Sequence, residues 1–413
     1  MGPLTDGPSS LAHDAMRAFA QHVAGAMALT IAAIVSTDEA SANFRPYQPA
    51  VLRLSYTNVE GEPTSFIDQT LIPAQGSPVG KRTKVNNKAF KTNLRQFYTQ
   101  LSSMAPISVV NPSDPARKMY DLLIRPLKQE LEEQKITTLL ISMDLELQSI
   151  PIAALHNGEK WFGQEFAFSV TPSMSLMPRV DNSGDDRNDK HLLAGNSQFK
   201  QLAPLPLVEQ EINKIAGFTN ATVALNENFS RERLFEEAES EDTNIIHLAT
   251  HAEFLPGRPG QSKIHMEDGT FTMDDLRQLR LSRQGKPLNL FTLSACRTAM
   301  GDSNSEHGLA GLALLAGAQS AIGTLWYVDD IATSIFFIRF YKWLNEGHTK
   351  SEAIRQSRNE LINGLLKVEN GQVVDGSGDI VLDELSTRQA IKLKDGLRHP
   401  YFWAAPVLLG KPW

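Results

Sequence analysis

The sequence predicts an α/β protein, with a mostly parallel sheet covered by helices on both faces (an αβα sandwich) and an N-terminal α+β region before it. Short, apolar, β-prone runs occur at 137–143, 245–249, 290–294 and 320–325. Runs of this kind are typical of strands that are buried on both faces. Segments with helical periodicity alternate with the runs in the second half of the chain. Such alternation indicates parallel βαβ units.

The N-terminal region combines helical and strand patterns. Within an N-terminal segment at 1–45, Leu11–Val35 carries apolar residues at near-helical spacing, so we expect a packing helix there. Val51–Tyr56 alternates apolar and polar residues, which predicts a half-exposed strand, with Phe66–Pro73 as its expected partner. Helical patterns follow at Asn86–Ser103 and Asp114–Gln134.

A polar stretch at 181–190 predicts a surface linker that divides the chain. We therefore expect one half at 46–180 and a second half at 191–413. Gly371–Arg398, rich in Gly and Asp, predicts a surface insertion within the second half. Helices are expected there near Leu207–Ile215, after Ser230, and at Met273–Leu279, Gly308–Leu315, Asp330–Leu344 and Lys350–Leu366.

Charge and hydropathy restrict the classes of partner. The net charge is −7 and the pI is near 5.8, which argues against broad binding of nucleic acid or anionic membranes, because both need basic surface. The first ten residues contain no basic residue, and the apolar run at 23–35 lies too far inside the chain for a secretory signal. No other run approaches the ~20 apolar residues of a membrane span. We expect a cytoplasmic protein.

Two of the strand runs end in residues capable of chemistry. The run 245–249 is followed by His251, and the run 290–294 by Cys296. In an open α/β sheet ligands bind beyond the carboxyl ends of the strands, so both side chains should project from one edge. Cys296 is the chain's single cysteine, which excludes an internal disulfide, a four-cysteine zinc site and a CxxC pair. Either a buried, inert thiol or a lone nucleophile remains, and the polar loop after Cys296 favours the nucleophile.

Several ordered motifs resemble those of the CHAT family of caspase-like cysteine peptidases. They are His-Leu-Ala-Thr-His-Ala-Glu-Phe (247–254), Leu-Ser-Ala-Cys-Arg-Thr-Ala-Met-Gly-Asp (293–302), Gly-Leu-Ala-Gly-Leu (308–312), Gly-Thr-Leu-Trp-Tyr-Val-Asp-Asp (323–330) and Tyr-Phe-Trp-Ala-Ala (401–405). The resemblance runs from about Pro46 to the end of the chain. It implies a caspase-like fold, with His251 as the catalytic histidine and Cys296 as the nucleophile.

The implied activity is that of a cysteine endopeptidase. Cys296 would attack the scissile carbonyl and His251 would carry the proton to the leaving amine. The backbone N–H groups of Cys296 and Ala252 would hold the oxyanion, although the position after the histidine is often Gly in caspase-like enzymes. This chemistry needs neither a metal nor a cofactor, and its substrate is a protein or peptide.

The resemblance also implies a preference for Arg or Lys at the cleaved residue, which needs an acidic pocket. The acids near predicted strand ends are Asp144, Asp302 and Asp329, of which we favour Asp144. The simpler alternative is that Asp144 only caps a loop. His247 lies four residues before His251, but on a strand the two separate by ~13 Å and cannot share an ion. We expect His247 in the core.

A second class of function remains open. The same fold could serve as a catalytically silent or partner-gated scaffold or sensor, with a regulatory partner protein. His251 and Cys296 argue against a silent relative. The linker offers Arg187 and Lys190 as sites for self-processing, and a passive loop is the simpler alternative.

Overall fold

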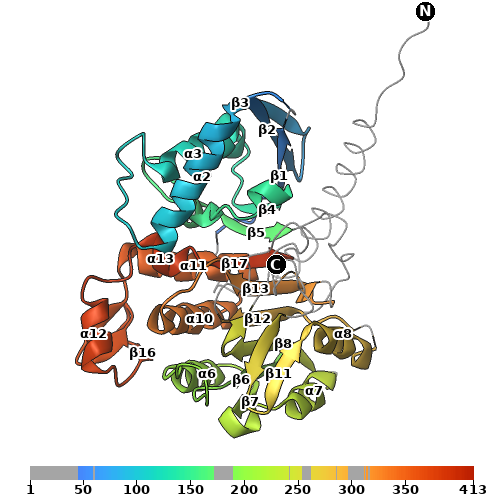
Figure 1. Cartoon of the computed structure of the whole chain (residues 1–413), viewed down its shortest axis with the longest axis vertical. Coiled ribbons are helices and arrows are strands. Elements are labelled where there is room, and N and C mark those ends of the chain that lie inside the picture. Colours follow the sequence, from blue (N-terminus) through green and yellow to red (C-terminus); the bar gives the residue numbers. More distant parts are fainter. Residues whose placement is uncertain are drawn as a thin grey trace, which may run out of the picture.

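The computed structural model describes residues 45–58, 61–171, 189–240, 242–253, 262–284, 286–295, 311, 313–314 and 317–413. One sheet of eleven strands crosses the molecule in the order β3-β2-β1-β4-β5-β17-β13-β12-β8-β6-β7 (Figure 1). Its strands are β1 Pro49–Asn58, β2 Thr64–Pro73, β3 Val79–Asn86, β4 Thr138–Met143, β5 Ala167–Thr171, β6 Lys190–Gly195, β7 Ala221–Leu225, β8 Thr243–Ala249, β12 Leu290–Ser294, β13 Ser320–Thr324 and β17 Pro406–Gly410.

The sheet is mixed and mostly parallel, which confirms the predicted class. Strands β13, β12, β8, β6 and β7 run parallel to one another. Strands β1, β4, β5 and β17 form a second parallel set, and β17 joins β13 antiparallel. The two sets therefore point in opposite directions. As a result, β8, β12 and β13 end at one edge of the sheet, and β4 and β5 end at the other.

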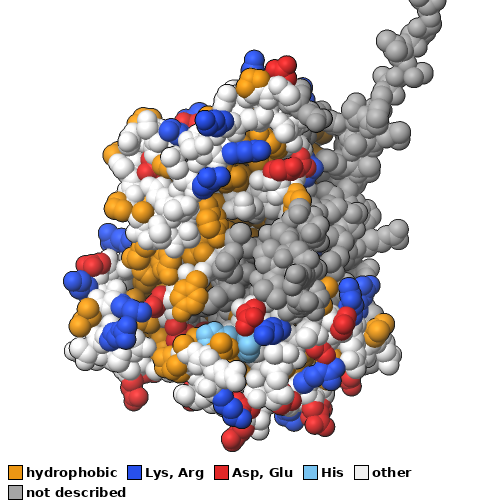
Figure 2. Space-filling model, viewed as in Figure 1, with side chains coloured by type: hydrophobic (Ala, Val, Ile, Leu, Met, Phe, Trp, Pro, Cys, Tyr) orange, Lys and Arg blue, Asp and Glu red, His pale blue; other side chains and the backbone are white. Residues whose placement is uncertain are grey.

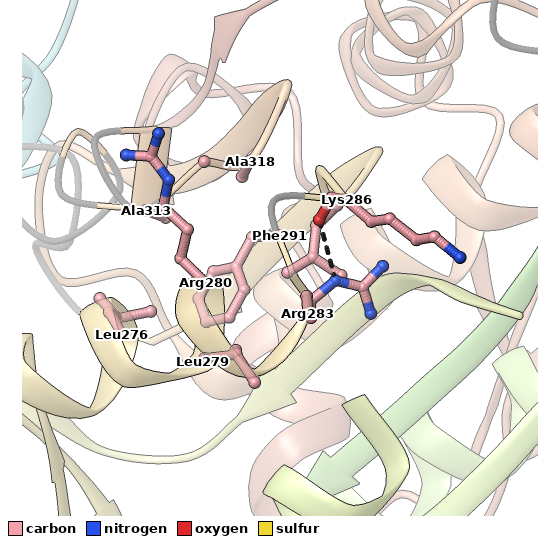
Figure 3. Close-up of a pocket in the computed structure, with 10 residues that line it drawn as sticks. Leu276, Leu279, Arg280, Arg283, Lys286, Phe291, Ala313 and Ala318 are labelled. Atoms are coloured by element: carbon pink, nitrogen blue, oxygen red, sulfur yellow. Dashed lines mark hydrogen bonds between the residues drawn. The ribbon is translucent and has the colours of Figure 1, made fainter. Parts of the chain in front are cut away.

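The strands predicted to be central are buried, as expected. Every residue of β4, β12 and β13 is buried, and so is β8 from Ile245 onward. On one face, His247 and Thr292 meet α6 (Val208–Ala216) and α10 (Asp330–Asn345). On the other face, Phe291 packs beside leucines of α8 (Met273–Ser282), as Figure 3 shows. Helices thus cover both faces of this part of the sheet.

The N-terminal strand pair forms as predicted, since β1 and β2 are antiparallel neighbours. Helix α2 spans Asn87–Ser102. The helix expected at 114–134 is instead divided into α3 (Pro115–Leu123), a 3₁₀ turn and α4 (Lys128–Glu133). The division falls at Pro126, which lacks the N–H that a continuous helix needs. The helix expected at Leu11–Val35 lies outside the described residues.

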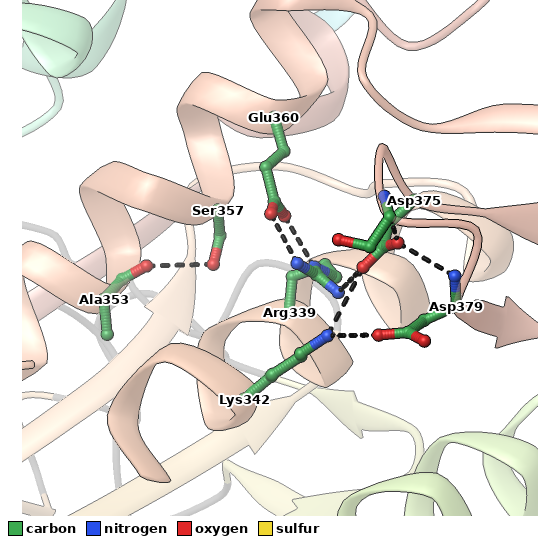
Figure 4. A network of polar contacts seen from close by, with 8 residues as sticks. Arg339, Lys342, Ala353, Ser357, Glu360, Asp375 and Asp379 are labelled. Atoms are coloured by element: carbon green, nitrogen blue, oxygen red, sulfur yellow. Dashed lines mark hydrogen bonds and ion pairs between the residues drawn. The ribbon is translucent and has the colours of Figure 1, made fainter. Parts of the chain in front are cut away.

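Segment 371–398 is more ordered than the predicted surface insertion. It holds β15 (Gln372–Val374), β16 (Ile380–Leu382) and α12 (Thr387–Leu393), and β14 (Lys367–Glu369) precedes it. Buried Arg339 of α10 holds it in place. Its guanidinium pairs with Glu360 of α11 (Lys350–Asn363) over 2.5 Å and with Asp375 over 2.7 Å (Figure 4).

Strand β6 was missed in the sequence, where Lys190 was assigned to the linker. Lys190 instead opens β6, which lies between β7 and β8. Residues 181–188 of the linker lie outside the described residues, and the division into 46–180 and 191–413 stays a prediction. Strands from both segments share one sheet. None of the helices in the described part of the chain is long and apolar enough to cross a membrane.

Candidate active site

His251 lies just beyond the carboxyl end of β8. Its Nε2 is 2.8 Å from the backbone carbonyl O of Ala203. A carbonyl oxygen can only accept, so Nε2 carries the proton and Nδ1 is the basic nitrogen of the neutral ring. The ring of Phe199 packs against the imidazole with the centroids 4.7 Å apart. The segment between β6 and α6 thus fixes both the tautomer and the orientation of His251.

The end of β12 lies directly beside the end of β8. Ser294 pairs in register with Ala249, so His251 and Cys296 each follow a paired position by two residues. The backbone carbonyl O of Ala295 accepts from Thr324 Oγ1 over 2.8 Å, which fixes the end of β12 to β13. Cys296 itself lies outside the described residues.

The peptide between His251 and Ala252 has a defined orientation. The backbone N–H of His265 donates to the carbonyl O of His251 over 2.8 Å, so that oxygen points toward β10 (Lys263–Met266). In a trans peptide the C=O and the following N–H point in opposite directions. The N–H of Ala252 therefore points away from β10. An oxyanion donor in the proposed role would have to point in this direction.

A pocket opens next to His251 at this edge of the sheet. Figure 2 shows histidine side chains at the surface beside a strip of hydrophobic side chains that crosses this face. The walls combine aliphatic, hydroxyl and acidic side chains from four parts of the fold. The lining residues are Leu205, Val208, Glu211, Thr250, His251, Ser294, Ala295, Thr324, Tyr327, Val328, Asp330 and Thr333.

Two acids that the sequence did not single out contribute to this pocket. Glu211 is almost fully buried and accepts from Ser334 Oγ over 2.8 Å. Asp330 is half-buried and accepts from the backbone N–H of Leu207 over 3.3 Å. Burial, with a smaller contribution from the negative charge of Glu211, raises the pKa of Asp330 to about 7. The acidity of the pocket therefore changes near neutral pH.

The predicted acids lie elsewhere. Asp144 follows β4, which ends at the edge of the sheet opposite His251, and its carboxylate pairs with Arg53 and accepts from the N–H of Tyr56 over 2.9 Å. This placement is incompatible with the pocket beside His251, so the favoured assignment of Asp144 is wrong. The choice failed because the opposite directions of the two sets of strands cannot be seen in the sequence.

Asp329 is the neighbour of the acid that does line the pocket. Its Oδ1 accepts from the N–H of Ile331 over 3.0 Å and caps α10, and its Oδ2 lies 2.6 Å from Nζ of Lys392 in α12. Both oxygens of Asp329 are thus engaged within the fold, whereas Asp330 faces the pocket. The pair of adjacent acids at the end of the motif 323–330 was the sequence feature from which Asp330 could have been predicted. Asp302 lies outside the described residues.

Three other histidines in the described part of the chain have structural partners. His247 is fully buried, with Nε2 2.9 Å from Glu211 Oε1, which confirms its expected place in the core. The Nε2 of His265 lies 2.9 Å from Glu253 Oε1, and His399 caps α13 (Pro400–Trp403) by accepting from the N–H of Tyr401 over 3.0 Å. Within the described residues, no cluster of three or more His, Cys, Asp or Glu side chains is arranged to bind a metal ion.

The fold and the site together define a class of protein. It is an α/β protein with a mostly parallel sheet, in which a histidine follows the carboxyl end of a buried strand. The model of the CHAT domain matches residues 113–411. The chain belongs to the CHAT domain family, as the motifs predicted. Among curated protein sequences none is significantly similar to it.

The chain is also similar to solved structures at low identity. One is separase from Saccharomyces cerevisiae in complex with securin, at 12% identity and a TM-score of 0.44, covering 87% of this chain and 30% of that chain. A second separase–securin structure gives 15% identity and a TM-score of 0.40, with 79% and 22% covered, so the chain spans about a fifth of that separase chain. The Arg-specific cysteine proteinase gingipain R gives 10% identity and a TM-score of 0.40, covering 79% of this chain and 75% of that chain.

Proposed function

We propose that the chain is a cysteine endopeptidase in which Cys296 is the nucleophile and His251 is the base. The observation that carries the proposal is the fixed imidazole of His251, whose protonated Nε2 is bound to Ala203 O beside the end of β12. Nδ1 is therefore the nitrogen that can accept a proton from a thiol. A free thiol has a pKa near ~8.5, so such a base is required at neutral pH.

The reaction follows from these groups. The Cys296 sulfur attacks the scissile carbonyl carbon while His251 Nδ1 takes the thiol proton. The oxyanion accepts hydrogen bonds from backbone N–H groups, of which that of Ala252 points away from β10. His251 then gives the proton to the leaving amine, and a thioester remains on Cys296. Water attacks the thioester, with its proton again passing to His251, and releases the second product.

The pocket supports cleavage after Arg or Lys. Aliphatic side chains of Leu205, Val208 and Val328 can cover the stem of a long basic side chain, and the acids Asp330 and Glu211 lie in the same pocket. We therefore assign the basic preference to Asp330, with Glu211 as the buried charge beside it. The substrate is a protein or peptide, and a regulatory partner protein stays a prediction.

Binding of an arginine side chain should depend on the ionisation of Asp330. Its pKa of about 7 means that the carboxyl is mostly neutral at pH 6 and mostly anionic at pH 8. The anion binds the cation, so a peptide with Arg at the cleaved position should bind about tenfold more tightly at pH 8. The measurement is the Kd of that peptide for the Cys296→Ala variant at both pH values.

Two variants complete this test. Asp330→Asn should bind the peptide weakly at both pH values. Its amide carries no charge to bind the cation, and it does not titrate. Asp329→Asn is the matched control, since Asn also caps a helix. It should keep a pH dependence, with the midpoint moved to lower pH, because the charge of Asp329 helps to raise the pKa of Asp330. A peptide with norleucine in place of Arg should bind equally at pH 6 and pH 8. Tight, pH-dependent binding of the Arg peptide to Asp330→Asn would contradict the assignment.

Self-processing of the linker should take place between molecules. Asp189, directly after the undescribed part of the linker, accepts from Asn244 Nδ2 over 2.8 Å and from Asn289 Nδ2 over 2.9 Å, at the amino ends of β8 and β12. His251 lies seven positions after Asn244, along β8 and the two residues that follow it, which spans about 23 Å in an extended chain. The anchored end of the linker therefore lies far from its own active site.

Dilution distinguishes cutting between two molecules from cutting within one molecule. Wild type and Cys296→Ala would be incubated alone and mixed, and fragments ending at Arg187 located by mass spectrometry, because Lys190 opens β6 and is no longer a linker residue. We expect wild type to cut Cys296→Ala, and the rate per molecule to rise with concentration. Cutting at a rate independent of concentration would contradict this prediction, and an intact chain with full peptidase activity would exclude processing as an activation step.

A further inference from the structure

His265 holds the segment that carries His251 at three points. Its backbone N–H donates to the carbonyl O of His251, and its own carbonyl O accepts from Thr250 Oγ1 over 2.7 Å. Its imidazole Nε2 lies 2.9 Å from Oε1 of Glu253. Because Glu253 belongs to β9 (Ala252–Glu253) and His265 to β10, the imidazole fixes the two strands to each other.

The carboxylate of Glu253 is held from two sides. Lys263 lies opposite Glu253 in the antiparallel register, with its Nζ 3.5 Å from Oε2. The hydrogen bond from His265, assisted by the charge of Lys263, lowers the pKa of Glu253. Glu253 is therefore an anion at neutral pH, which strengthens the bond that it accepts from the imidazole.

We propose that Glu253 and His265 are positioning residues that aim the backbone N–H of Ala252 at the oxyanion. This inference rests on the proposed function, because it concerns the same reaction. Ala252 lies between two points bound to His265, the carbonyl O of His251 on one side and the Glu253 carboxylate on the other. The intervening peptide planes cannot rotate without weakening one of these bonds. An N–H that points away from the oxyanion stabilises the transition state less, because hydrogen bonds weaken steeply as they bend.

Two variants that break the side-chain bond should lower kcat without changing substrate binding. His265→Leu removes the donor and Glu253→Ala removes the acceptor, while the backbone hydrogen bonds stay possible. We expect kcat to fall about tenfold, below the 10²–10³ lost when a whole oxyanion donor is removed, and KM to change by less than about twofold. His265→Gln places an amide N–H near the position of Nε2 and should restore most of kcat.

Alkylation of Cys296 separates positioning of the N–H from activation of the thiol. Iodoacetamide needs a thiolate and makes no oxyanion, so its rate should stay within about twofold of wild type in all three variants. The surface variant Asp68→Asn, which removes a partner of Arg82 far along the sheet, is the control and should leave every rate unchanged. All rates are measured at a temperature well below the thermal unfolding midpoint of each variant.

The outcomes are distinguishable. Unchanged kcat in both His265→Leu and Glu253→Ala, or His265→Gln as slow as His265→Leu, would overturn the inference alone. An equal fall in iodoacetamide rate would overturn it as well, because the pair would then act on the thiol. A wild-type chain that hydrolyses no peptide would contradict the proposed function, and this inference with it.

Discussion

Replacement of either Cys296 or His251 by Ala should reduce kcat/KM by about 10⁴-fold or more, and replacement of both should cost little beyond either one. The two groups act as one unit, because the thiol needs its base and the base has no role without the thiol. Thermal unfolding should stay close to wild type. His251 is only partly buried, and within the described part of the chain its imidazole donates one hydrogen bond, to Ala203 O, and makes one ring contact, with Phe199.

The measurement is peptide hydrolysis beside thermal unfolding for the two single variants and the double variant. Asp68→Asn serves as the surface control. A single variant with full activity would contradict the mechanism. A double variant far slower than both single variants would show that the two residues act independently, which is also incompatible with a dyad.

Arg339→Met should give the largest loss of stability, about 3–5 kcal/mol in the free energy of unfolding at pH 7.5. The substitution leaves Glu360 and Asp375 as buried carboxylates without the guanidinium that both contact (Figure 4). Burial already raises the pKa of Glu360 against the opposing effect of Arg339. Without Arg339 this pKa should rise further, so Glu360 takes up a proton more readily as the pH falls.

The pH dependence tests the cause of that loss. Because the protonated carboxyl is cheaper to bury, the deficit of Arg339→Met relative to wild type should be smaller at pH 5.5 than at pH 7.5. The measurement is urea unfolding at both pH values. Asp68→Asn, which breaks a pair that is 63% and 27% exposed, should cost less than about 1 kcal/mol. A deficit for Arg339→Met below that of Asp68→Asn, or independent of pH, would contradict the prediction.

The sequence was most informative where one local pattern determines one element. The apolar runs at 245–249 and 290–294 identified β8 and β12 because strands buried on both faces need continuous apolar residues. The same runs placed His251 at the edge of the sheet. Strand β6 was missed because its first residue, Lys190, continues a polar stretch and conceals the start of the apolar run.

Features that depend on the direction and contact of distant segments could not be predicted. Asp144 was chosen as a pocket acid because it follows a strand, yet β4 ends at the opposite edge of the sheet. Asp329 and Asp330 are adjacent in the sequence, and their roles differ only through contacts with distant residues. Asp329, the helix cap, pairs with Lys392, whereas Asp330, the acid of the pocket, accepts from the N–H of Leu207. The Glu253–His265 pair was missed because its members lie on neighbouring strands, twelve residues apart.

Labelling by a peptide chloromethyl ketone with Arg at its reactive end tests the proposed dyad most directly. We expect one adduct on Cys296 in wild type, located by mass spectrometry, and a rate in His251→Ala lower by about 10² or more, because the base that activates the thiol is missing. Iodoacetamide at high pH, where the thiol ionises unaided, should alkylate Cys296 in both proteins and show that the residue is accessible. Equal labelling of wild type and His251→Ala at neutral pH, or rapid peptide hydrolysis by a chain whose Cys296 is fully blocked, would contradict the account.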